Sequence, residues 1–115
     1  MQESCTHFEK AISLNPNCYY AWDNWGVLLY NSARINNDKN LLKEGIEKCR
    51  RAYMINDACS YNLACGYALI NDKANALLYL SKSLKNNVIS VDNVKNDEDW
   101  KNYLSDKDFI NIFND

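Results

Sequence analysis

Residues Tyr61–Asn87 read YNLACGYALINDKANALLYLSKSLKNN. The stretch is rich in Ala, Leu and Tyr, and its small and large apolar residues recur at three- and four-residue spacing in two groups, which is typical of helices. Leu63, Ala64 and Tyr67 form an L-A-x-x-Y group, and a small-x3-large-x2-small group follows at Ala76, Leu80 and Ser83. We therefore predict a helical hairpin, and we ask whether it is one copy of a repeat.

The same two groups occur earlier in the chain, in the same order. The segment AWDNWGVLLY matches the first group, GIEKCRRA matches the second, and SCTHFEKAISLNP near the N-terminus matches the second group again. The matching residues are Trp22, Trp25, Gly26 and Leu29; Gly45, Cys49 and Ala52; and Ser4, Phe8 and Ala11, followed by Pro16. Five half-copies in the correct order favour a repeat over a chance match.

This pattern resembles the tetratricopeptide repeat, whose W-x2-L-G-x2-Y…A-x3-F…P signature marks a helix–turn–helix unit of about 34 residues. The resemblance covers roughly residues 2–87 and implies an all-α fold, a tetratricopeptide-like α-solenoid of antiparallel helix hairpins. Small residues such as Gly26, Ala64 and Ala76 are expected where two helix backbones approach closely. The apolar stripe of Leu42, Ile46, Cys49 and Tyr53 is expected to face the core.

The spacing departs from 34 residues at two places. Phe8 and Cys49 are 41 residues apart, and Cys49 and Leu80 are 31 residues apart. We assign the surplus of about seven to a longer loop in NSARINNDKN, between the two helices of the first complete repeat. The deficit of about three is assigned to INDACS, between the repeats. Both changes are expected in loops, where insertions and deletions cost little.

The last segment, VISVDNVKNDEDWKNYLSDKDFINIFND, is acidic and carries several large apolar residues. We expect short helices near 90–96, 98–104 and 106–113, with Ser105 and Asp108 forming a capping box. The segment resembles the acidic tails that end bacterial tetratricopeptide proteins, which implies a cap on the last repeat. The expected organisation is 1–18, the second helix of an incomplete repeat; 19–56, a repeat with a lengthened inter-helix loop; 57–89, a repeat; and 90–115, a helical C-terminal cap.

Composition excludes several classes of function. A net charge of −2 over 115 residues argues against a nucleic-acid binder, and Lys48, Arg50 and Arg51 are interpreted as a solvated face. No apolar run approaches the ~20 residues of a membrane span, so no membrane partner is expected. Five cysteines with no C-x-x-C motif fit a reducing, cytoplasmic environment.

Catalysis and metal binding have little support in the sequence. His7 is the only histidine, and no catalytic motif surrounds it, so we expect no enzyme. The spacing of the cysteines does not match zinc-ligand pairs, and the acidic tail lacks the glycine of a calcium loop. We expect no cofactor and no metal, and interpret Cys49 and Cys65 as packing residues, with a cysteine-based metal or redox site as the minor alternative.

The resemblance implies a non-catalytic scaffold that binds a peptide or partner helix in a concave groove lined by the first helices of successive repeats. The carboxylate clamp of some family members is not expected, because Asp23, Val27, Tyr61 and Cys65 stand at the matching positions. The alternative is a purely structural end of a longer array, with binding elsewhere. The groove residues implied by the register are Tyr20, Asp23, Asn24, Val27, Tyr30, Asn31, Tyr61, Asn62, Cys65 and Leu69.

The N-terminal edge carries a further expectation. Phe8 and Ala11 match a second helix whose first helix is absent from this sequence. Exposed apolar edges of this kind favour association. We therefore expect the chain either to belong to a longer array or to form a homodimer through the incomplete repeat.

Overall fold

The computed structural model describes residues 2–114 and, from Phe8 onward, their side chains. Within this range all regular structure is helical, which confirms the all-α prediction. No helix in these residues is both long and apolar enough to cross a bilayer. The helices are α1 (Gln2–Leu14), α2 (Tyr19–Asn36), α3 (Lys39–Ile55), η1 (Asp57–Cys59), α4 (Ser60–Leu69), α5 (Lys73–Lys85), α6 (Val91–Asn96), η2 (Glu98–Tyr103) and α7 (Lys107–Phe113).

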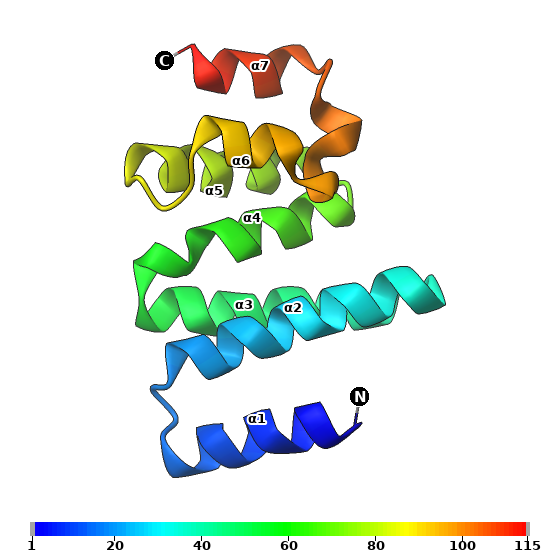
Figure 1. Cartoon of the computed structure of the whole chain (residues 1–115), viewed down its shortest axis with the longest axis vertical. Helices are drawn as coiled ribbons and strands as arrows, with labels where there is room; N and C mark the ends of the chain where they lie inside the picture. The colour runs from blue at the N-terminus through cyan, green and yellow to red at the C-terminus, as the bar shows by residue number, and fades with distance from the viewer. Residues whose placement is uncertain (1, 115) are drawn as a thin grey trace.

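Two helix hairpins, α2–α3 and α4–α5, form the centre of the molecule and stack along its long axis, with α1 at one end and α7 at the other (Figure 1). Both hairpins turn at the tripeptide Asn-Asp-Lys. Asn37 and Asn71 adopt left-handed backbone angles, with φ of 50° and 65°, a conformation that Asn tolerates better than most residues. Asp38 and Asp72 then cap the next helix by accepting bonds from its first backbone N–H groups.

The α2 and α3 backbones touch at a pair of glycines. A Cβ atom on Gly26 would overlap Cys49 Sγ and lie 2.8 Å from the carbonyl oxygen of Gly45. The predicted close approach at Gly26 is therefore confirmed. Leu42, Ile46 and Cys49 are buried along the same side of α3, as their spacing predicted.

The prediction of a lengthened loop within residues 19–56 is wrong, because the residues that exceed the repeat of about 34 residues are helical. The helices α2 and α3 have 18 and 17 residues, against 10 and 13 for α4 and α5, and only Asn37 and Asp38 separate them. The segment folds as helix because Ala33 on α2 and Leu42 on α3 are buried there, so lengthening both helices extends their contact. The longer hairpin projects beyond its neighbour in Figure 1.

The tail folds as α6, η2 and α7, which confirms the three predicted helical segments. Trp100, Tyr103 and Phe109 are buried in one aromatic cluster, and the rings of Trp100 and Phe109 stack at 5.7 Å between centroids. The predicted cap at Ser105 is one residue early. Asp106 is the N-cap of α7, because its carboxylate accepts bonds from the backbone N–H groups of Asp108 and Phe109.

Helix α1 packs on α2 through stacked aromatic rings. Phe8 stacks on Trp25 at 6.5 Å, and Trp25 stacks on Trp22 at 6.0 Å. Lys48 places its Nζ 4.1 Å from the centre of the Trp25 ring, and Arg51 lies over Trp22. These two cations of the basic cluster are thus held against tryptophans of the fold. Ser4, Cys5 and His7 lie outside the described side chains.

Candidate partner-binding face

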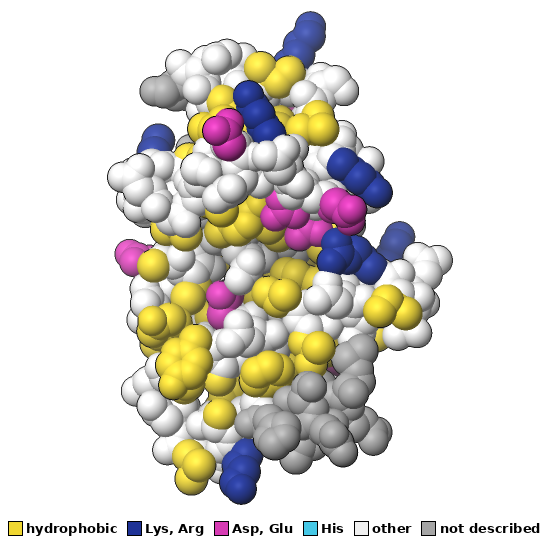
Figure 2. Space-filling model, viewed as in Figure 1, with side chains coloured by type: hydrophobic (Ala, Val, Ile, Leu, Met, Phe, Trp, Pro, Cys, Tyr) yellow, Lys and Arg dark blue, Asp and Glu magenta, His cyan; other side chains and the backbone are white. Residues whose placement is uncertain are grey.

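Four of the expected groove residues form one stripe on α2, because Tyr20, Asn24, Val27 and Asn31 follow each other at intervals of four, three and four residues. Tyr20 is 62% exposed, Asn24 and Asn31 are exposed, and Val27 is half-buried. We call this stripe, together with Asp23 of α2 and Tyr61 and Asn62 of α4, the α2–α4 face. In Figure 2 hydrophobic side chains run along α2 toward α4, with acidic side chains among them.

Tyr30 does not belong to this face, contrary to the prediction. Its side chain is only 3% exposed and lies between the hairpins, where its hydroxyl donates a hydrogen bond of 2.9 Å to the backbone carbonyl of Asn62. The ring occupies space that Gly45 and Gly66 leave open by lacking a Cβ atom. Tyr30 therefore joins α2 to α4 and has no surface for a partner.

Asp23 and Asn62 join the two helices at the surface of the face. The Asn62 side-chain amide donates a bond of 2.8 Å to Asp23 Oδ2, while Asp23 Oδ1 is buried without a hydrogen-bond partner. Burial raises the pKa of Asp23, and the bond from Asn62 opposes that rise. Asp23 is thus a carboxylate that is only partly satisfied by the protein.

The tail covers the part of α4 that follows Asn62. Tyr61 donates a hydroxyl bond of 2.6 Å to Asp97 Oδ2 in the tail, and burial raises the pKa of this tyrosine. Arg34, near the end of α2, pairs with Asp99 at 2.7 Å. Cys65 lies beneath these contacts and is 1% exposed. The expectation that Cys65 lines an open groove is therefore wrong, because η2 packs against α4.

Leu69, the last predicted groove residue, is half-buried at the far end of α4. It borders a surface cavity of about 160 Å³ that Ala33, Arg34 and Leu42 of the long hairpin also line. None of the four stripe residues of α2 lines this cavity, so Leu69 contributes to a different surface.

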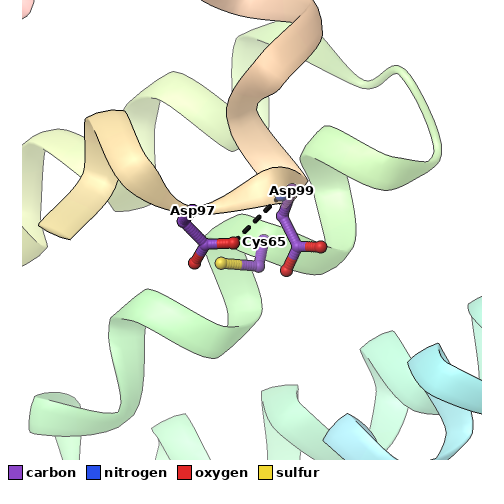
Figure 3. Close-up of side chains that lie close together, drawn as sticks. All are labelled: Cys65, Asp97 and Asp99. Atoms are coloured by element: carbon purple, nitrogen blue, oxygen red, sulfur yellow. Dashed lines mark hydrogen bonds between the residues drawn. The ribbon is translucent and has the colours of Figure 1, made fainter.

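Cys65, Asp97 and Asp99 form the group of described residues best suited to hold a metal ion, with their ligand atoms within 4.8 Å of one another (Figure 3). These atoms already have protein partners. Asp97 accepts bonds from Tyr61 and from the backbone N–H of Asp99, and Asp99 pairs with Arg34. Burial and the two nearby carboxylates raise the pKa of the Cys65 thiol, so the sulfur is held as S–H. The arrangement supports packing of the tail better than metal coordination.

The other described cysteines are also unpaired and buried. Burial raises the pKa of Cys49 to about 12 and that of Cys59 to about 11. A thiol must lose its proton to act as a nucleophile or metal ligand, so these environments favour unreactive packing residues.

Sequence reasoning missed the residues that attach the tail to the two hairpins. The sequence pattern predicts a loop at Arg34, and it assigns Asp97 and Asp99 only to the cap. No local pattern pairs a residue of α2 with a carboxylate 65 positions later. The one available signal was the acidic run before Trp100, which marks a segment in need of hydrogen-bond donors.

Comparison of the chain with protein-family models, with curated proteins and with solved structures finds no match.

Proposed function

We propose that this protein is a non-catalytic interaction scaffold of the tetratricopeptide-repeat type, which binds a protein or peptide segment on the α2–α4 face. The observation that carries the proposal is the exposed stripe of Tyr20, Asn24, Val27 and Asn31 on α2. A tyrosine offers a large rigid surface to a partner, and the Asn24 amide offers both donors and an acceptor to a peptide backbone. The Asn31 oxygen already accepts a bond from Arg34, so this residue offers mainly its N–H donors.

The face differs from the groove expected from the sequence in its extent. Tyr30 and Cys65 are buried, and Tyr61 is bonded to the tail. The proposed surface is therefore centred on α2 and ends where η2 packs on α4.

Capture of a partner from source lysate tests the proposal when it is combined with matched surface variants. Tyr20→Ala with Asn24→Ala removes two exposed side chains of the stripe, of which Tyr20 contacts the edge of the neighbouring Tyr19 ring, and should abolish capture. Met54→Ala with Leu78→Ala changes two exposed side chains on α3 and α5 and should leave capture intact. Equal loss with both pairs, or loss with neither, argues for binding at another surface or for the structural alternative.

A further inference from the structure

The 3₁₀ helix η2 and its N-cap Asp97 cover the part of α4 that the repeat register assigns to the groove. We call this segment, residues 97–103, the strap. Tyr61 of α4 donates its hydroxyl to Asp97. Arg34 of α2 pairs with Asp99 from a side chain that is 46% exposed. Water competes for the charges of a partly exposed ion pair, so this pair holds the strap only weakly.

Two polar groups of the strap are poorly satisfied while it is docked. The indole Nε1 of Trp100 is buried with no hydrogen-bond partner among the described residues. Burial and the neighbouring charge of Asp97 raise the pKa of Asp99, and Arg34 only partly opposes that rise. Both groups regain hydrogen bonds to water when the strap leaves α4. The free energy that they regain opposes the burial of the Trp100 ring, which favours the docked state.

The tail and the long hairpin each have contacts that do not involve α4. The tail holds a cluster of aromatic rings that contact one another, namely Trp100, Tyr103, Phe109 and Phe113. The α2–α3 hairpin is held by the close contact of Gly26 with Gly45 and Cys49. The strap can therefore separate from α4 without breaking the contact between α2 and α3.

We propose that the strap lifts from α4 while both hairpins stay folded, and that this movement opens the α4 half of the α2–α4 face to a partner. The lifting stands on the contacts of the strap, whereas the control of the face rests on the proposed function. Folded proteins open such segments as minor states of the native ensemble. A partner that requires α4 binds only the lifted fraction, so its apparent affinity falls in proportion to that fraction. The strap thus sets how tightly the face can bind.

Labelling of the full chain with N-ethylmaleimide, in the absence of denaturant, tests the lifting. Cys65, which lies beside Asp97 and Asp99 (Figure 3), is 1% exposed, and Cys49 is 0% exposed between α2 and α3. Mass spectrometry should show Cys65 reacting about tenfold faster than Cys49, or more, with a weaker dependence on urea, because lifting exposes less surface than unfolding does. Equal rates with equal urea dependence would mean that the strap leaves only when the whole chain unfolds, which overturns the proposal.

Asp97→Ala loosens the strap from the tail side and leaves the hairpin residues unchanged. It removes the acceptor of the Tyr61 hydroxyl and the N-cap of η2. Labelling of Cys65 should become about tenfold faster, while labelling of Cys49 stays unchanged. Glu98→Ala removes the neighbouring exposed carboxylate and is the matched control for the change of charge. Equal effects of the two variants on Cys65, or a rise at both cysteines together, would count against the proposal.

Peptides selected on the full chain from a phage-displayed library of random dodecapeptides test the control of the face. Those that lose affinity with Tyr20→Ala and Asn24→Ala are labelled with fluorescein. Their affinity for Asp97→Ala should exceed that for the parent by the factor by which this variant accelerates Cys65 labelling, because both measurements report the lifted fraction. Equal affinity for the two chains overturns the control of the face and leaves the scaffold proposal standing. Failure to select any peptide that depends on Tyr20 and Asn24 counts against the proposed function and the control together, whereas the labelling of Cys65 still decides whether the strap lifts.

Discussion

Arg34 and Asp99 join the first hairpin to the tail across 65 residues of sequence, with Nη1 of the arginine 2.7 Å from Oδ1 of the aspartate. Burial raises the pKa of Asp99 despite this cation, so the carboxylate depends on Arg34 for its charged form. Arg34→Leu should lower the free energy of unfolding by about 1 kcal/mol, and the coupling between Arg34→Leu and Asp99→Asn should be about 0.5–1 kcal/mol.

Urea unfolding of the two single variants and the double variant measures this coupling. Additive losses would mean that the pair contributes nothing and that the tail is held by its apolar contacts alone.

The tail should be part of the cooperative fold. Trp100 is fully buried against Tyr103 and Phe109, so Trp100→Ala leaves a large cavity and should cost roughly 3–5 kcal/mol. Leu104→Ala is the control, because Leu104 is exposed in the same segment and its loss should be small. A parent-like unfolding curve for Trp100→Ala would make the tail an independent appendage.

Stability should fall as pH rises through the carboxyl range because of Asp23 and Asp99. Burial raises both folded-state pKa values, so the folded chain retains protons that the unfolded chain has already lost. Their stabilising contribution is complete below the unfolded pKa of about 4 and is lost as pH rises through the folded pKa. Asp23→Asn removes one of the two titrating carboxyl groups. The urea midpoint of this variant should therefore depend less steeply on pH than that of the parent, when both are measured between about pH 3 and pH 7.

The pKa of Asp106 shifts in the opposite direction, so this residue serves as a comparison. Lys73 lowers its pKa, so its contribution is present above the unfolded pKa and is lost as pH falls through the folded pKa. An Asp23→Asn variant whose slope equals that of the parent would mean that Asp23 does not titrate differently on folding.

The Cys65–Asp97–Asp99 group should not hold an intrinsic metal. The purified chain should contain much less than one equivalent of zinc, and a chelator should leave Tm unchanged. The reason is that Tyr61 and Arg34 already occupy the two carboxylates, and Cys65 remains a thiol. One equivalent of zinc that is lost in Cys65→Ala would establish a metal site instead.

The exposed edge of α1 should mediate self-association. Leu14 is 79% exposed at the end of this helix, and apolar edges of helical arrays favour association. Light scattering should report a mass above that of the monomer for the parent and a shift toward the monomer for Leu14→Asp. Phe8→Asp is a poorer test, because Phe8 stacks on Trp25 within the chain.

Ile35→Asp is the matched control, since Ile35 is equally exposed but lies on α2. A parent chain that is monomeric at every concentration would show that this edge does not associate.

The helices could be predicted from the sequence because their signals are local. The spacing of Leu42, Ile46 and Cys49 identifies a buried helix face, and small residues such as Gly26 mark a close contact between helices. A repeat of fixed length predicts a loop for segment 31–36, because it leaves no other position for these residues. The structure places them in α2, where burial of Ala33 favours helix.

The candidate site was harder to predict because exposure depends on contacts between distant segments. Tyr30 occupies a groove position by register, yet it is buried where Gly45 and Gly66 make room for its ring. Cys65 is covered by a tail whose position no periodicity encodes. The register predicts groove positions on the first helix of each pair, but it does not indicate which of those residues stay uncovered.

The extra length of α2 and α3 also constrains how such a hairpin can vary. An α-helix completes a turn about every 3.6 residues, so adding one whole turn to each helix of the hairpin would leave the same sides facing each other. Two residues added to one helix would rotate everything beyond them by about 200°, which would separate Gly26 from Gly45 or turn Arg34 away from Asp99. The reach of this hairpin toward the tail can therefore change only in steps of about 5.4 Å, the rise of a single turn.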